Sequence, residues 1–174
     1  ATTAAALAVG GNLTVGSGTT FTAAGFNLTV TGATSVSGTL THSSATGTKT
    51  FTGNVTLNNG GTWNEAAAAA ISFGGSLQND GTFTAGTAVH TFTGAVKTFS
   101  GSSGISLPSM TITSPGAYQN NGTLTVGTAL IGTGSLTQGS GATLNLGGTS
   151  TITGLVATAS PNAVNYNGAA QTIK

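Results

Sequence analysis

The sequence predicts an all-β fold: a three-faced parallel β-helix, or β-solenoid, of about eight coils of about 20 residues each. Three observations predict it. Apolar residues recur with one period along the whole chain, they lie in short segments that alternate with Thr or Ser, and clusters of Gly and Asn separate the segments. We expect residues 1–174 to form a single solenoid, wound right-handed by analogy with other parallel crossovers.

The first series of apolar residues marks nine positions, each next to Thr or Gly. Its steps are 21, 21, 22, 19, 20, 19, 21 and 21 residues, a mean of about 20.5. The similar segments FTGNV (51–55) and FTGAV (92–96) each begin with one member and lie two steps apart. The series comprises Val9, Val30, Phe51, Phe73, Phe92, Ile112, Ile131, Ile152 and Ile173.

Two further series share this period, one before and one after a Gly-containing turn. The residues before the turn are Leu13, Val36, Leu57, Leu77, Phe99 (or Val96 in its place), Tyr118, Leu136 and Val156. The residues after the turn are Phe21, Leu40, Trp63, Phe83, Ile105, Leu124, Leu144 and Val164. Because alternate residues of a strand point to opposite sides, these series predict short strands with the apolar residue inward. Three strands make one coil, and each pairs in parallel with its counterpart one coil on.

The corners of the coil are predicted from Asn and Gly. The segments 58–61 (NNGG), 79–81 (NDG) and 120–122 (NNG) precede the third series at the same phase. Both residue types tolerate the positive φ of tight turns. We therefore interpret these Asn residues as corner residues and not as a ligand site.

Residues 64–73 (NEAAAAAISF) have the highest helix propensity in the chain, because Ala is the best helix former. A helix of about seven residues is marginal on its own. It would also disturb the register that Phe73 restores. We therefore expect a corner followed by a strand here, with Trp63 in the core.

Composition argues against most chemistry. Only 3% of the residues are charged, the net charge is +1, and there is no Cys. This balance does not predict binding to nucleic acid, and no apolar run reaches the roughly 20 residues of a membrane span. Glu65 and Asp80 fall at different positions of the coil, and His42 and His90 are isolated in the sequence. We expect no enzyme, no metal site and no cofactor.

Thr residues flank five members of the first series on both sides. If those members point inward, the Thr residues form two outward columns on one flat face. Such T-x-T arrays resemble the ice-binding face of antifreeze solenoids, although outward Thr is also what a parallel strand prefers. This candidate Thr face, for ice or glycan, comprises Thr29, Thr31, Thr50, Thr52, Thr91, Thr93, Thr111, Thr113, Thr151 and Thr153.

The two ends of the sequence show no capping helix. Leu7 and Val9 at one end and Ile173 at the other are candidate assembly ends, because an open coil offers free strand edges. We expect either head-to-tail stacking of copies into a filament, with residues 1–8 as an extension that contacts a neighbouring subunit, or further repeats of the same chain.

The segments GTFTAGTAVHTFTGAVKTFSG (81–101), LPSMTIT (107–113) and VNYNGAAQTIK (164–174) resemble repeats of large secreted bacterial β-solenoid proteins. These are adhesin-like surface proteins of the Bacteroidota type and filamentous-haemagglutinin-like exoproteins. The resemblance implies a secreted, cell-surface structural protein that forms fibres or adheres, with itself or surface glycans as partner and no catalytic residue. The alternative is a binding module that uses the Thr- and Asn-rich face.

Overall fold

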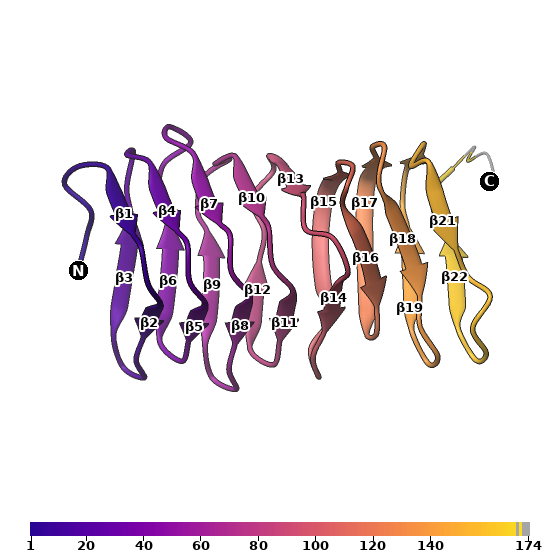
Figure 1. Cartoon of the computed structure of the whole chain (residues 1–174), viewed down its shortest axis with the longest axis horizontal. Coiled ribbons are helices and arrows are strands. Elements are labelled where there is room, and N and C mark those ends of the chain that lie inside the picture. Colours follow the sequence, from indigo (N-terminus) through magenta and orange to yellow (C-terminus); the bar gives the residue numbers. More distant parts are fainter. Residues whose placement is uncertain (170, 172–174) are drawn as a thin grey trace.

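The computed structural model describes residues 1–169 and 171, which form a rod of stacked coils with the two ends of the chain at opposite ends (Figure 1). The described residues contain 22 strands and no helix, and hence no helix able to cross a membrane. The strands are β1 Leu7–Val9, β2 Leu13–Val15, β3 Thr20–Ala23, β4 Leu28–Val30, β5 Thr34–Val36, β6 Thr39–His42, β7 Lys49–Phe51, β8 Val55–Leu57, β9 Thr62–Glu65, β10 Ile71–Phe73, β11 Leu77–Asn79, β12 Thr82–Thr84, β13 Val89–Phe92, β14 Lys97–Ser100, β15 Ile105–Ile112, β16 Ala117–Asn120, β17 Thr123–Ile131, β18 Ser135–Gln138, β19 Thr143–Leu146, β20 Thr149–Ser150, β21 Gly154–Val156 and β22 Ala163–Tyr166.

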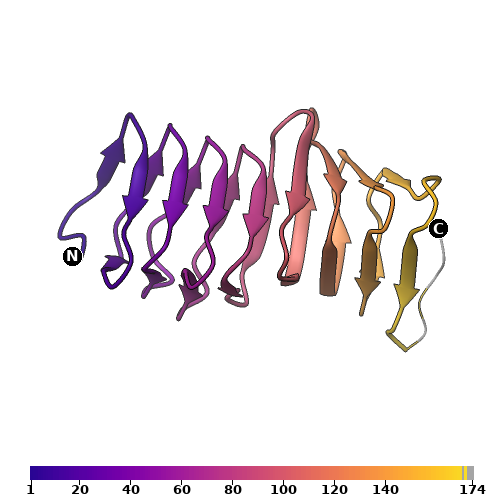
Figure 2. The same ribbon diagram turned by 90° about the horizontal axis from the view of Figure 1, so that it is seen from below.

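Each coil contributes a strand to each of three faces, and every strand pair is parallel. The first face stacks β1, β4, β7, β10 and β13, then the second halves of β15 and β17, then β20. The second face stacks β2, β5, β8, β11, β14, β16, β18 and β21, which counts eight coils. The third face stacks β3, β6, β9 and β12, then the first halves of β15 and β17, then β19 and β22. The predicted fold class is therefore confirmed, and Figure 2 shows the same succession of coils from below.

The first series is in register from Val9 to Ile112, since each member pairs with the next. Ile131 breaks it: it pairs with Thr111, at an outward position, and Leu130 is the buried residue of that coil. Gly127 and Thr128 of β17 lie opposite the single Pro108 of β15, where the register shifts. This extra residue is a β-bulge, and it reverses which residues point inward. Ile173 lies outside the described residues.

The second turn-linked series is confirmed in two blocks. Phe21, Leu40, Trp63 and Phe83 form one ladder, and Ile105, Leu124, Leu144 and Val164 form the other. No ladder joins β12 to β15 between them. The series before the turn is only partly in register, because the strands of the second face offer two inward positions. Val36 pairs with Leu57, for example, whereas Leu57 pairs with Asn79.

Aromatic rings form the core of the middle coils. On the first face, Phe73 stacks between Phe51 and Phe92, with centroid separations of 5.9 and 5.1 Å. On the third face, Trp63 stacks on Phe83 at 5.6 Å. Burying each large apolar side chain contributes roughly 1.5–3 kcal/mol. The stack therefore stabilises the rod where charged side chains are scarce.

A column of glycines lines the corner between the first and second faces. Gly11, Gly32, Gly53 and Gly75 recur at steps of 21, 21 and 22 residues. A Cβ on Gly53 would lie 2.3 Å from the carbonyl oxygen of Gly32, and one on Gly75 would lie 2.2 Å from that of Gly53. Successive coils approach so closely here that no side chain fits.

The alanine segment forms a corner, as predicted, and not a helix. Residues 66–70 connect β9 on the third face to β10 on the first. The N–H of Ala69 donates to the carbonyl of Ala67 (2.9 Å), and Ala69 is buried while Ala66, Ala68 and Ala70 are exposed. Packing of the coils has therefore overridden local helix propensity.

Candidate functional site

The ten residues of the candidate Thr face all point outward from the first face, and all are exposed or half-buried. One column runs directly from coil to coil through Thr29, Thr50, Ser72, Thr91 and Thr111, and Ile131 interrupts it. The other column lies just beyond the ends of the strands and has a gap at Gly74. There the N–H groups donate to the preceding coil, for example from Thr52 to Val30 and from Thr113 to Phe92, each at 2.9 Å.

This face presents methyl and hydroxyl groups at regular spacing. Neighbouring coils of a parallel sheet lie about 4.8 Å apart, and residues i and i+2 of a strand lie about 6.6 Å apart. The two charged or titratable residues of these strands, Lys49 and His90, are buried on the inner side. Among the described residues, the outer surface of the first face is therefore uncharged.

A polar cluster lies inside the corner between the third and first faces. The carboxylate of Glu65 accepts hydrogen bonds from the Trp63 indole N–H (2.7 Å) and the Gly86 N–H (2.6 Å). His90 Nε2 lies 2.9 and 3.1 Å from the two carboxylate oxygens. The side chains of Glu65 and His90 are 0% exposed, so this pair is sealed from solvent.

His42 is buried beside this pair, since β6 and β9 align it with Glu65. Its ring centroid lies 4.6 Å from that of Trp63, and neither ring nitrogen has a hydrogen-bond partner. Burial lowers the pKa of His42 to about 4, opposed by the carboxylate of Glu65. His42 is therefore neutral at pH 7.

Lys49 is the buried cation of the same corner. Its ammonium donates to the carbonyl oxygens of Phe26 (2.9 Å), Thr46 (3.1 Å) and Gly47 (2.9 Å). Burial lowers the pKa of Lys49. These three acceptors replace the water that the ammonium loses, and they hold the 43–48 corner against β7.

Sequence reasoning treated His42 and His90 as isolated and so missed the cluster. The ladder that it predicted between Leu40 and Trp63 already aligns His42 with Glu65, two residues further along each strand. His90 comes from the other face, 25 residues after Glu65, and only the geometry of the corner reveals it. No group of three or more His, Cys, Asp or Glu able to hold a metal ion occurs in the described part of the chain. The cluster has the character of a structural element.

Asp80 lies apart from this cluster, at the corner between the second and third faces. Its carboxylate accepts from the backbone N–H of Ser102 (2.7 Å) and from its hydroxyl (3.0 Å), and also from the amide of Gln78. The Ser102 N–H is the main group that lowers the pKa of Asp80. Asp80 therefore fixes the 101–104 loop of the next coil.

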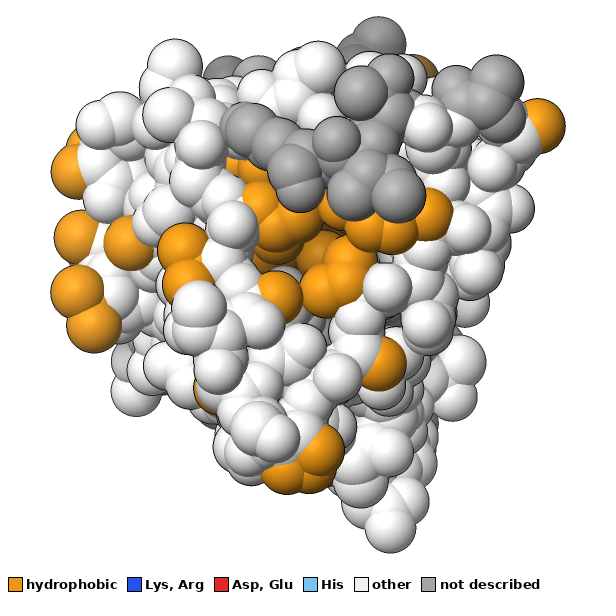
Figure 3. Space-filling view, turned by 90° about the vertical axis from the view of Figure 1, so that its right-hand side faces the viewer, with side chains coloured by type: hydrophobic (Ala, Val, Ile, Leu, Met, Phe, Trp, Pro, Cys, Tyr) orange, Lys and Arg blue, Asp and Glu red, His pale blue; other side chains and the backbone are white. Residues whose placement is uncertain are grey.

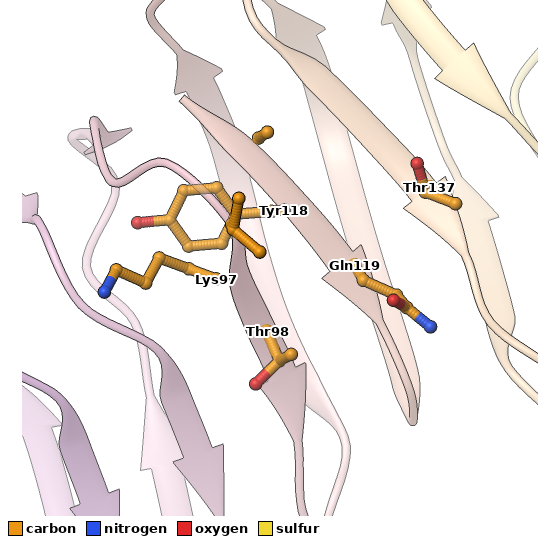
Figure 4. A pocket seen from close by; sticks show the side chains of 7 residues that line it. Lys97, Thr98, Tyr118, Gln119 and Thr137 are labelled. Atoms are coloured by element: carbon orange, nitrogen blue, oxygen red, sulfur yellow. The ribbon is translucent and has the colours of Figure 1, made fainter. Parts of the chain in front are cut away.

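The surface grooves are shallow. One groove of about 210 Å³ crosses the second face (Figure 4) and is lined by Val96, Lys97, Thr98, Ala117, Tyr118, Gln119 and Thr137. Val96 is 89% exposed and has a φ of 53°, a strained value for a β-branched residue. The side chains of Lys97, Gln119 and Thr137 point in different directions (Figure 4), so the groove offers no convergent polar group.

The end coils carry the candidate assembly residues. Leu7 is 36% exposed and Val9 is half-buried in β1, which pairs only with β4. Residues 1–3 lie along β3 of the same chain: the Thr3 N–H donates to the Thr22 carbonyl (3.0 Å) and the Thr22 N–H to that of Ala1 (2.7 Å). At the other end, hydrophobic side chains are visible in the middle of the cross-section (Figure 3). Val164 and Tyr166 there are only half-buried.

Comparison with known proteins found no matching family model, and no curated protein or solved structure with significant similarity.

Proposed function

We propose that this protein is an extracellular structural β-solenoid at the cell surface. In it, rods stack head to tail, and the occupant of each end is a coil of a second copy or of a further repeat. The observation that carries the proposal is the free, parallel edge that the ladders leave at each end. All pairs share one direction, so the edge at β1 is complementary to the edge that follows the last coil.

The apolar residues of the end coils support the same proposal. Leu13 and Phe21 at one end, and Leu155 and Val164 at the other, belong to columns that are fully buried further along the rod. A further coil in register would cover them and bury roughly as much apolar surface as an internal coil does. Because such a contact does not close on itself, it makes filaments.

Electron microscopy and sedimentation of the purified chain test this proposal. Filaments that lengthen with concentration, with a subunit repeat of roughly 40 Å for eight coils, are expected. Leu7 donates its N–H to Asn27, and Val9 accepts from Thr31, so the backbone of Ala8 faces the free edge. Ala8→Pro should therefore block assembly without loss of an internal hydrogen bond. Ala5→Pro, an exposed change outside the strands, is the matched control. A monodisperse monomer at high concentration would contradict the proposal.

A second candidate function is binding of a flat, uncharged, repeating surface such as ice or an insoluble glycan. The observation that favours it is the coil-to-coil register of Thr29, Thr50, Thr91 and Thr111 around Ser72. Thermal hysteresis, ice shaping and sedimentation with crystalline polysaccharide measure it. Activity should be lost in Thr91→Lys, which places a hydrated charge in the array, and kept in Gln119→Lys on the second face. Absence of ice shaping and of polysaccharide binding in the natural chain removes this candidate.

A further inference from the structure

Titratable groups of the acid range are confined to one stretch of the rod. The chain has two His, one Asp and one Glu, and all four lie between residues 42 and 90. The stretch spans coils 2–5, where each coil is counted from its first-face strand. Coil 1 and coils 6–8 contain no Asp, Glu or His. Between about pH 3 and pH 8, side-chain protonation therefore acts only on coils 2–5.

Three of these four groups meet at one buried corner. His42 on β6 faces Glu65 on β9, with Lys49 on β7 and His90 on β13 as the other titratable groups around it. The Glu65 carboxylate already holds Trp63, Gly86 and His90. Neither nitrogen of His42 has a partner, and the Nδ1 atom of His90 has none either. A proton added to His42 would thus create a buried cation whose N–H groups find no acceptor in this geometry.

The corner has one way to relieve such a charge. The loops 43–48 and 66–70 close it from outside, and neither contains a strand. Exposed residues such as Ala66 and Ala68 lie on the second loop, so moving it uncovers little apolar surface. We infer that coils 2–5 form an acid-labile segment, in which protonation of His42 opens this corner while coils 6–8 stay paired. This inference is independent of the proposed function.

The direction of the effect follows from linkage. The pKa of His42 is lowered in the folded rod to about 4 from its ordinary value of 6.5, so the open state binds more protons between these values. Protection of the corner is complete above about pH 6.5, falls as the pH is lowered toward 4, and falls no further through His42 below that. A difference of this size corresponds to a loss of about 100-fold in the closing equilibrium.

Hydrogen exchange at pH 7 and pH 4, corrected for intrinsic rates, tests the inference on the intact chain. Amides of β6 and β9 should lose about 100-fold in protection, whereas those of β18 and β19 should change little. The ring protons of His42 should titrate near pH 4. Equal loss in all coils, or titration of His42 near its ordinary pKa, would overturn the inference.

A variant separates His42 from the other groups. His42→Phe keeps a ring against Trp63 and Phe51 but cannot be protonated, so the acid-induced loss at β6 and β9 should disappear. Asp80→Asn removes an exposed carboxylate from the same segment and should leave the loss unchanged. A His42→Phe protein that still loses protection at pH 4 shows that His42 is not the trigger. If that variant does not fold, the contrast between β9 and β19 in the natural chain decides the question.

Discussion

Replacing Trp63 with Ala should lower the free energy of unfolding by about 4 kcal/mol, at the upper end of what a single core truncation costs. Trp63 is 0% exposed, and its ring packs against those of Phe51 (5.1 Å), Phe73 (5.7 Å) and Phe83 (5.6 Å). It therefore joins the aromatic columns of two faces. Truncation would leave a cavity that a rigid stack of coils cannot collapse to fill.

The indole also has a polar role, which a second variant isolates. Trp63→Phe keeps a ring in the stack but removes the N–H that donates to Glu65. Its cost should be smaller, about 2 kcal/mol, the value of a hydrogen bond to a buried charge. Since Trp63 is the only Trp, guanidinium unfolding should be followed by circular dichroism.

Phe26→Ala provides the control for the Trp63 variants. Phe26 is 44% exposed and lies in the corner between β3 and β4, so its truncation should cost less than about 1 kcal/mol. Equal losses for Phe26→Ala and Trp63→Ala would show that the aromatic stack contributes nothing special to the rod.

The fold could be predicted from the sequence because a solenoid repeats its physics. Each coil must place an inward apolar residue above that of the coil before, so the period of the sequence is the period of the structure. The shorter steps after Phe73 even reflect a structural change. The corner from the third to the first face takes five residues at 66–70 but only one, Pro108, inside β15.

What the sequence could not predict depends on single residues. Ile131 kept the expected spacing, but the additional residue at Gly127 and Thr128 shifted it to the outside. Glu65 and His90 belong to different faces, and their contact depends on how the corner turns. Periodicity gives the inward positions, whereas corners set which side chains from neighbouring faces meet.

Replacing Gly53 with Val should destabilise the rod by about 3 kcal/mol, the upper part of the range for overpacking. A Cβ at this position would lie 2.3 Å from the Gly32 carbonyl oxygen and 2.5 Å from its carbonyl carbon. Both atoms are backbone, so no side chain can move aside. The coils must separate locally, which strains the neighbouring hydrogen bond from the Thr34 N–H to the Asn54 carbonyl (2.8 Å).

Gly11 supplies a control from the same column of glycines. It occupies the equivalent corner of the first coil, where a Cβ would find nothing within 4 Å. Gly11→Val should therefore change the midpoint of thermal unfolding little, whereas Gly53→Val lowers it by many degrees. If the two variants unfold alike, the glycine column reflects a conformational need of the chain and not the close approach of coils. If filaments form, Gly11→Val should also impair their assembly, because a neighbouring rod would then place its own corner against Gly11.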